Sequence, residues 1–530
     1  MRGPRALRSE LSELPDRGTR SIGRFSRLIA FVSGAVSAFA FQPVGLWPLM
    51  LLAFTVLCEL LARAETLRRS LLIGWLFGLA QFVIGLNWIA TAFTYQAAMP
   101  AWLGWIAVVL LSLYLAVYPM LAAGLAWTFG RSRPIALVLT LAGAWAITEW
   151  LRAGIFTGFA WNPVGVTLDN THLLNASTVI GTYGLSALVV LGGGMLWLLF
   201  RRDWRPAGML LLAIIALHFV PRPREADVPS VNVRIIQPNI GQQDKWRPGF
   251  AQIASQRLAQ LSMKPGNEKR HLLLWPEAAV TDPLEDGRNP PYSQFAVMER
   301  QLAAAVIRPG EYLLTGAIGL TSADGRRVNG ATNSVYVLGQ GGMIVDRYDK
   351  AHLVPYGEYL PMRPLLEPLG LARLAPGDVD FQPGPGPRTA TIPGWGKVGF
   401  QLCYEIIFSG HVVDEADRPR FIFNPSNDAW FGSWGPPQHL AQARLRAAEE
   451  GIPIVRSTPT GISAVIDAHG QVLKSLPWRQ PGVIDAQLPP PAASLTLFAR
   501  YGNIIPILIG FALIIGGIVL GRGRRYRTDI

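Results

Sequence analysis

Three residues at the ends of predicted strands have the chemistry of a nucleophilic catalytic site. Glu277 follows the apolar run LLLWP, Lys350 follows a predicted hairpin strand, and Cys403 follows the alternating sequence VGFQL. A thiol attacks only as the thiolate, so Glu277 would accept its proton. Lys350 would stabilise the thiolate and then the oxyanion of a tetrahedral intermediate, helped by the backbone N–H of Tyr404. The three side chains together predict covalent catalysis through Cys403.

Each of these side chains also has a structural interpretation that residue types alone leave open. Glu277 suits a turn, Lys350 suits the surface, and cysteine at a buried strand end behaves as a small apolar residue. Glu358 is an alternative ion-pair partner. The only other cysteine, Cys58, lies in an apolar run, so we expect no disulfide and a free thiol at Cys403. A free thiol in an oxidising compartment is unusual unless the protein uses it.

The composition predicts a polytopic α-helical membrane bundle. The 530 residues are 50% hydrophobic and 16% charged, with a mean hydropathy of +0.28, which is too apolar for an ordinary soluble protein. Eight runs approach the roughly 20 residues that cross a bilayer. They are about 27–42, 45–62, 70–94, 101–129, 134–152, 176–200, 206–220 and 502–521. The first two are short and joined by Gln42-Pro43, so one re-entrant hairpin is an alternative for them.

The arginines predict the orientation of these spans. Apart from Arg152, the basic residues outside the 221–501 segment are arginines in the two terminal segments and in alternate connections between spans. By the positive-inside rule, both termini are cytoplasmic. The predicted organisation is a cytoplasmic tail (1–26), about seven spans (27–220), a periplasmic domain (221–500), a final span (501–521) and a cytoplasmic tail (522–530). A basic tail is also typical of nucleic-acid binding, but the alternation favours topology, and we expect no nucleic-acid partner.

The 221–500 segment predicts an extramembrane α/β domain. Strands of period 2 alternate with helical stretches and outlying hairpins, which indicates an α/β fold or a four-layer α-β sandwich. The seven histidines are scattered, and the sequence has no metal-binding Cys/His spacing, no P-loop and no GxGxxG. We therefore expect no metal and no cofactor.

Several motifs in this segment resemble a known family. WPE, DKAHLVPYGEYLP and CYE, in that order, look like the Glu–Lys–Cys triad of the nitrilase superfamily. The wording HLVPYGEYLP, the NPSNDAWFG box and the flanking spans resemble its membrane-embedded branch, the apolipoprotein N-acyltransferase family. The resemblance implies an α-β-β-α sandwich, with Glu277 as general base and acid, Lys350 as electrostatic stabiliser and Cys403 as nucleophile.

The same resemblance implies roles for further residues. Glu358 would be a second carboxylate that positions Lys350, and Asn333 would hold the Lys/Glu network. Tyr404 and Glu405 match the residues beside the nucleophile. The substrate-binding predictions are Trp246, in a loop over the pocket, and Asn427 and Trp430 of the NPSNDAWFG box. For the last two, packing of a turn is an equal alternative.

The implied reaction is acyl transfer in two steps. Cys403 would take a fatty acyl chain from a membrane phospholipid and pass it to the α-amino group of the N-terminal diacylglyceryl-cysteine of an apolipoprotein, a ping-pong scheme. The expected partners are the phospholipid, the apolipoprotein and the bilayer of the bacterial inner membrane, and we expect a monomer. A membrane-anchored nitrilase-type amidase, with water as acceptor, would use the same residues. A transporter would need charged or broken helices near the midplane, and few are present.

Two further segments each have two alternative interpretations. Glu149 and Arg152, three apart on one predicted helix, are either a lipid-headgroup contact or a structural pair. The proline-rich segment 363–387 is either an arm that reaches lipid through its leucines or a loop packed on its own domain. Those leucines are Leu365, Leu366, Leu369, Leu371 and Leu374.

Overall fold

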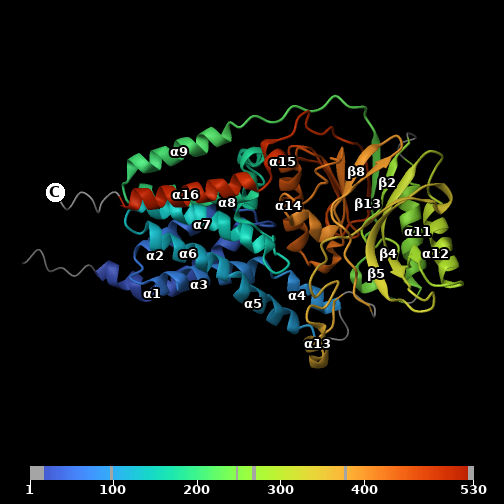
Figure 1. Ribbon diagram of the computed structural model, residues 1–530, viewed down its shortest axis with the longest axis horizontal. Coiled ribbons are helices and arrows are strands. Elements are labelled where there is room, and N and C mark those ends of the chain that lie inside the picture. The colour runs from blue at the N-terminus through green and yellow to red at the C-terminus, as the bar shows by residue number, and fades with distance from the viewer. Residues whose placement is uncertain are drawn as a thin grey trace, which may run out of the picture.

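The computed structural model is elongated, with a helical bundle at one end and a two-sheet domain at the other (Figure 1). It describes residues 17–95, 100–245, 247, 249–265, 270–374 and 379–522. The chain builds most of the bundle first, crosses to the sheets, and returns with one last helix.

The helices of the bundle coincide with the predicted apolar runs. They are α1 (Arg17–Ser37), α2 (Pro48–Ala62), α3 (Leu67–Gly85), α4 (Ile89–Ala92), α5 (Leu103–Leu115), α6 (Val117–Gly130), α7 (Pro134–Gly154), α8 (Ser177–Phe200), α9 (Trp204–His218) and α16 (Ile504–Arg522). In the described part of the chain, five helical segments are long and apolar enough to cross a membrane: Leu67–Gly85, Leu103–Gly130, Pro134–Gly154, His172–Phe200 and Ile504–Arg522. The segments around α1, α2 and α9 are shorter, so the count of about eight spans remains a prediction.

Glycine lets the last helix pack closely on the bundle. A Cβ atom added at Gly143 of α7 would lie 2.3 Å from the backbone oxygen of Gly510 of α16. Small residues of this kind allow helix backbones to approach within a membrane, where dispersion replaces the hydrophobic effect as the packing force. The contact joins two parts of the chain that the whole sheet domain separates.

The domain contains two mixed β-sheets. The first has the order β13-β1-β2-β4-β5-β6, with β3 beside β4, and the second has the order β12-β11-β10-β9-β8-β7. The strands of the first sheet are β1 (Asn232–Gln237), β2 (Leu272–Leu274), β3 (Glu285–Asp286), β4 (Tyr312–Thr321), β5 (Gly330–Leu338), β6 (Ile344–Asp349) and β13 (Gly482–Gln487). The strands of the second are β7 (Thr389–Ile392), β8 (Gly396–Phe400), β9 (Phe421–Pro425), β10 (Ile454–Ser457), β11 (Ala464–Ile466) and β12 (Val472–Ser475).

The sheets stack face to face and helices cover their outer faces. On β1, Val233 and Ile235 enter the core between the sheets, whereas Ile236 packs towards the outer helices, as the period of 2 along a strand requires. The outer helices are α11 (Phe250–Ser262) and α12 (Tyr292–Ala304) on the first sheet and α14 (Gly435–Glu450) on the second (Figure 1). This is the predicted α-β-β-α sandwich.

Two of the predicted reactive residues follow parallel strands, one in each sheet. In the first sheet β1, β2 and β4 are parallel, and in the second β8, β9 and β10 are parallel. The carboxyl ends of parallel strands share an edge, which is where loops with functional residues gather. Glu277 follows β2 and Cys403 follows β8, so the topology places both at such edges.

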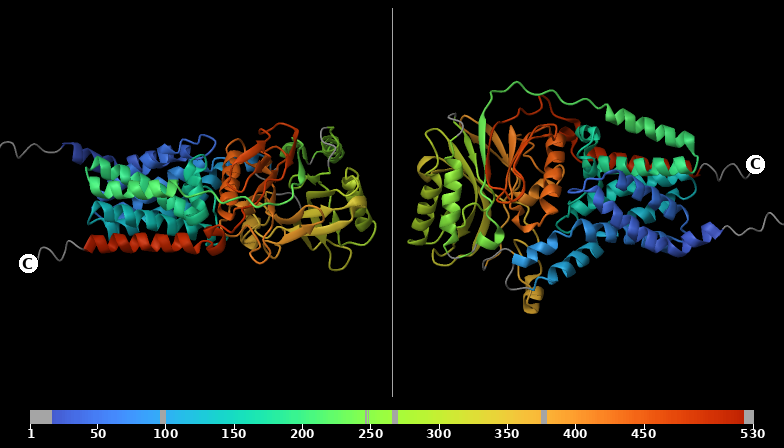
Figure 2. Two further views of the ribbon diagram at one scale, coloured as in Figure 1. Left: turned by 90° about the horizontal axis from the view of Figure 1, so that it is seen from above. Right: turned by 180° about the vertical axis from the view of Figure 1, so that it is seen from behind.

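One carboxylate joins the sandwich to the bundle. α14 lies between the second sheet and the bundle (Figures 1 and 2), and its Glu449 accepts hydrogen bonds from the backbone N–H of Thr182 at 2.6 Å and from the Thr182 hydroxyl at 2.7 Å. The Thr182 N–H is available because Gly181, with φ +62°, interrupts α8 immediately before it. Arg446 forms an ion pair with Glu449 at 2.9 Å.

The Glu149 and Arg152 side chains are both buried in the bundle. Glu149 accepts from the Val164 N–H at 2.9 Å, and Arg152 donates to the Trp161 carbonyl at 2.8 Å. Both charges therefore hold the 153–175 connection in place, which favours the structural interpretation over a lipid contact.

We expect Glu449→Ala to destabilise the protein strongly. The substitution leaves the Arg446 charge and the Thr182 N–H buried without their acceptor, a loss of about 3–5 kcal/mol in the free energy of unfolding. Thermal and denaturant unfolding of the full chain in detergent measure it. Glu415→Ala, at an exposed position of the same domain, is the control, and equal stability of the two variants would contradict this account of the junction.

Candidate active site

The backbone at Cys403 is strained and held from two sides. β8 ends at Phe400, and a short 3-10 helix begins at Cys403, whose φ is +50°. A non-glycine residue in this region costs roughly 1–3 kcal/mol and persists only when its surroundings enforce it. His439 donates from Nε2 to the Cys403 carbonyl oxygen at 3.0 Å, and the Glu405 carboxylate accepts from the Leu402 N–H at 2.7 Å. These bonds fix the turn that presents the sulfur.

A buried network links the other predicted residues. The Lys350 Nζ atom lies 2.9 Å from Glu358 Oε2 and 3.8 Å from Glu277 Oε1. The Asn333 amide, on β5, donates to Glu277 Oε1 and to Glu358 Oε1, at 2.8 Å each. Lys350 is 1% exposed, so its charge is retained only because two carboxylates surround it. The structure thus brings Glu277, Lys350, Glu358 and Asn333 together.

The electrostatics of the network define the resting state of the thiol. Burial raises the pKa of the Cys403 thiol, the Glu277 carboxylate raises it further, and the Lys350 ammonium opposes both. For Lys350, burial acts to lower the pKa, but Glu358, Glu277 and Cys403 outweigh it, and the pKa of the ammonium is raised. At neutral pH the site therefore holds a protonated thiol beside a charged lysine, and attack requires a base.

Glu405 positions the two reactive loops relative to each other. Its Oε1 atom accepts hydrogen bonds from the Tyr348 hydroxyl at 2.9 Å and from the N–H groups of Ala351 at 2.7 Å and His352 at 3.0 Å. With the bond to Leu402, one carboxylate joins the loop after Lys350 to the turn of Cys403. All its described bonds are to structural groups, so Glu405 is a positioning residue.

Tyr404 points towards the bundle. Its ring packs on Phe408, with ring centroids 5.3 Å apart, and on His352, with centroids 5.8 Å apart. Its hydroxyl donates to the Gly158 carbonyl at 3.3 Å. Tyr404 therefore contacts the 153–175 connection of the bundle, which puts the candidate site at the junction between the sandwich and the membrane-type helices.

The predicted substrate-binding residues differ in their positions. Trp246 lies outside the described residues. Asn427 follows β9, its backbone N–H acts to lower the pKa of the Cys403 thiol, and its side-chain amide donates to Gln242 at 3.3 Å. Trp430 is half-buried and packs edge-to-face on Tyr95, with centroids 5.8 Å apart. Asn427 thus lies near Cys403, and Trp430 lies at the bundle.

Sequence reasoning missed a buried cluster behind the nucleophile. Arg456 of β10 donates to both oxygens of Asp428, at 2.7 and 2.6 Å, and lies 2.9 Å from Nδ1 of His439. Burial and Arg456 lower the pKa of His439, whereas Asp428, whose Oδ1 lies 2.9 Å from Nδ1, opposes that shift. Asp428 lies in the NPSNDAWFG box, but nothing in the sequence linked that box to a histidine on a helix or an arginine on a strand.

Lys245 is a second lysine that the sequence did not indicate. It is buried, burial lowers its pKa to about 8, and the Glu277 carboxylate opposes that shift. Its position, at the end of the short helix α10 (Gln242–Lys245), puts a weakly basic amine within the electrostatic range of Glu277.

Comparison with known proteins assigns the chain to a family. The family model of the apolipoprotein N-acyltransferase N-terminal domain matches residues 33–195, and the carbon-nitrogen hydrolase model matches residues 232–496. The chain is 34% identical to the apolipoprotein N-acyltransferase of Rhodopseudomonas palustris over 516 residues, with 92% of this chain and 93% of that protein covered. For the Caulobacter vibrioides protein of the same name, the identity is 34% with 94% of each covered. The chain belongs to the apolipoprotein N-acyltransferase family.

Membership of the apolipoprotein N-acyltransferase family makes this chain an acyltransferase of lipoprotein biosynthesis with a nitrilase-superfamily domain. The family and the apolar helices indicate a bacterial membrane protein, and the amidase alternative is not favoured. One similar solved structure is that of Saccharomyces cerevisiae Nit3, a member of the nitrilase superfamily. The two chains are 18% identical with a TM-score of 0.37, and the match includes 52% of this chain and 95% of Nit3.

The raised pKa of Cys403 predicts a pH-dependent reactivity. In a Cys58→Ala chain Cys403 is the only thiol, and below its pKa the thiolate fraction grows about tenfold per pH unit. We expect alkylation by iodoacetamide, followed by mass spectrometry, to accelerate accordingly from pH 7 to pH 9. Lys350→Met removes the charge that lowers this pKa and slows the reaction at fixed pH, whereas Lys397→Met, at an exposed ion pair, leaves it unchanged. A rate that levels off below pH 8 would contradict the assignment.

Proposed function

We propose that the chain transfers a fatty acyl group from a membrane phospholipid to the α-amino group of an N-terminal diacylglyceryl-cysteine of an apolipoprotein, through a thioester on Cys403. The observation that supports this most directly is the buried Glu277–Lys350–Glu358 network within electrostatic range of a strained Cys403. Its position at the junction with the bundle supports substrates that reside in a membrane.

In the first half-reaction Glu277 takes the thiol proton and the sulfur attacks the ester carbonyl carbon. The negative charge that develops on the carbonyl oxygen is stabilised by the Lys350 ammonium. When the tetrahedral intermediate collapses, the carbon–oxygen bond breaks and the lysophospholipid alkoxide takes the proton from Glu277. Glu358 and Asn333 hold the Lys350 and Glu277 side chains in position throughout both steps.

In the second half-reaction the neutral α-amine attacks the thioester carbonyl. Glu277 accepts a proton from the amine nitrogen, the carbon–sulfur bond breaks, and the proton returns to the Cys403 sulfur. The products are an amide and the free thiol, so the enzyme ends as it began. An amine is a nucleophile only when neutral, so the same base serves both halves.

We further propose a membrane topology for the chain and an arm, the 363–387 segment, that contacts lipid. Both termini lie in the cytoplasm, the sandwich lies in the periplasm of the inner membrane, and the enzyme acts as a monomer. The helix α13 (Arg363–Leu366) projects beside α4 and α5 (Figures 1 and 2), and Leu365 and Leu369 are 67% and 74% exposed. Exposed leucines next to the bundle support an arm that reaches lipid, although Leu366, Leu371 and Leu374 are half-buried on the protein.

The acyl-enzyme is the direct test of this proposal. We expect wild-type protein, incubated with labelled phospholipid and a diacylated lipopeptide, to carry an acyl adduct on Cys403 and to add a third chain to the peptide, as read by mass spectrometry. Cys403→Ser gives neither product, and Glu277→Gln slows both by roughly 10²–10⁴-fold. Cys58→Ala, which removes a buried thiol of α2, acts as the control and keeps activity. Free fatty acid as the sole product would support hydrolysis instead.

The arm predicts a dependence on the lipid surface. With phospholipid presented in vesicles, the double variant Leu365→Glu/Leu369→Glu forms the acyl-enzyme at a rate reduced roughly tenfold or more, because two apolar anchors are lost. Leu473→Glu, at a 53% exposed position on β12, is the matched control. A double variant as fast as this control would exclude the arm from lipid capture.

A further inference from the structure

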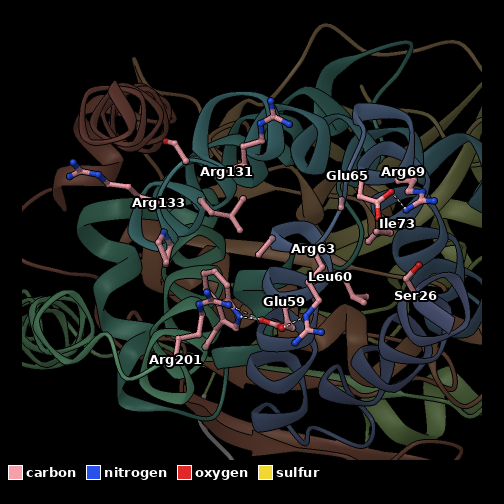
Figure 3. Close-up of a pocket in the computed structure, with 16 residues that line it drawn as sticks. Ser26, Glu59, Leu60, Arg63, Glu65, Arg69, Ile73, Arg131, Arg133 and Arg201 are labelled. Carbon is pink, nitrogen blue, oxygen red and sulfur yellow. Dashed lines mark hydrogen bonds and ion pairs between the residues drawn. The ribbon is translucent and has the colours of Figure 1, made fainter. Parts of the chain in front are cut away.

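A cavity of about 620 Å³ lies at the end of the bundle remote from Cys403 (Figure 3). It is lined by Ser26 in the middle of α1, by the ends of α2, α3, α7 and α8, and by the connections α2–α3, α6–α7 and α8–α9. On α8, Thr182 bonds to the sandwich, whereas Trp197 lines this cavity. Fifteen residues of helix separate the two, roughly 22 Å at 1.5 Å per residue. The acyl-transfer chemistry therefore makes no use of it.

The lining of this cavity is strongly basic. Five arginines (Arg63, Arg69, Arg131, Arg133 and Arg201) and two glutamates line it. Glu59 forms ion pairs with Arg63 and Arg201, and Glu65 forms one with Arg69. Figure 3 shows these pairs as dashed lines, with Arg131 and Arg133 set apart from them. In the described part of the chain neither Arg131 nor Arg133 has a carboxylate partner, so the cavity has an excess of positive charge.

Two other features of the cavity suit an anionic lipid. α7 begins at Pro134 in the cavity wall with no side-chain cap, so its first N–H groups and the positive end of its 21-residue dipole are available to an anion. Leu60, Ile73 and Leu137 supply an apolar wall beside the charges. Arg131 is kept in place by stacking over Trp127 at 3.9 Å. A phosphate group attached to hydrocarbon matches this combination, whereas a free ion has no use for the apolar wall.

We propose that this cavity binds the phosphate group of an anionic phospholipid in the leaflet opposite the sandwich, with Arg131 and Arg133 as its principal ligands. Basic pockets between membrane helices recognise such headgroups by charge, at roughly 1 kcal/mol for each arginine near the surface. The site would anchor the end of the bundle in the leaflet that does not supply the acyl chain. It does not depend on acyl transfer, and binding alone tests it.

The test compares lipid-dependent stabilisation of the full chain. We expect added phosphatidylglycerol to raise the unfolding temperature of the detergent-purified protein more than phosphatidylcholine does, because only the first has a net negative charge. In Arg131→Gln/Arg133→Gln the apparent affinity for phosphatidylglycerol falls about ten- to thirtyfold. Arg68→Gln/Arg205→Gln removes the same charge from exposed positions outside the cavity and keeps the wild-type affinity.

Two further measurements decide between the site and its alternatives. Ser132→Glu leaves every arginine in place and adds a carboxylate to the cavity lining, so it weakens phosphatidylglycerol binding even if the double arginine variant fails to fold. Glycerol phosphate, which lacks the acyl chains, gives less than a tenth of the affinity. Equal stabilisation of the cavity variants and the Arg68/Arg205 control overturns the site, and equal binding of glycerol phosphate overturns the assignment to a lipid.

Discussion

The ammonium group of Lys350 is the interaction on which the active-site region depends. A lysine that is 1% exposed loses several kcal/mol of hydration, and only close carboxylates compensate for that loss. Glu358 supplies the nearer oxygen and Glu277 the farther one, and the Asn333 amide joins the two carboxylates through one nitrogen. Burial and, after it, the Glu277 carboxylate raise the pKa of the Cys403 thiol, whereas the Lys350 ammonium opposes them. Removing any one of these groups would leave the others buried without compensation.

Two buried carboxylates outside this network join separate segments of the protein through hydrogen bonds. Glu405 connects the Lys350 loop to the turn of the nucleophile, and Glu449 connects α14 to the interrupted start of α8. His439, on the same α14, bonds to the carbonyl of Cys403. The strained turn at Cys403 and the bundle are therefore both bonded to α14, the outer helix of the second sheet. Under the proposed function, this coupling holds the thiol in a fixed geometry relative to reactants that come from the bilayer.

The two ends of the bundle differ in the charge they present. At the end near the sandwich, the Glu149 and Arg152 side chains form hydrogen bonds with the backbone of the 153–175 connection. The other side chains at this junction are largely aromatic. At the remote end, arginines outnumber glutamates and line an open cavity. This difference in charge supports the proposed orientation, in which the arginine-lined end faces the cytoplasm.

The sequence by itself determined most of the local elements and a set of candidate reactive groups. Apolar runs became helices and period-2 runs became strands because burial patterns follow the geometry of each element. The order WPE, DKAHLVPYGEYLP, CYE, read through its resemblance to a family, predicts Glu277, Lys350, Glu358 and Cys403 as the site residues. What the tertiary structure decided were contacts between residues far apart in the chain. The Asp428–His439–Arg456 cluster comes from a turn, a helix and a strand, and Glu449 meets Thr182 across 267 positions. Such pairs have no local periodicity, because their proximity arises only when the sheets stack and α14 packs on the bundle.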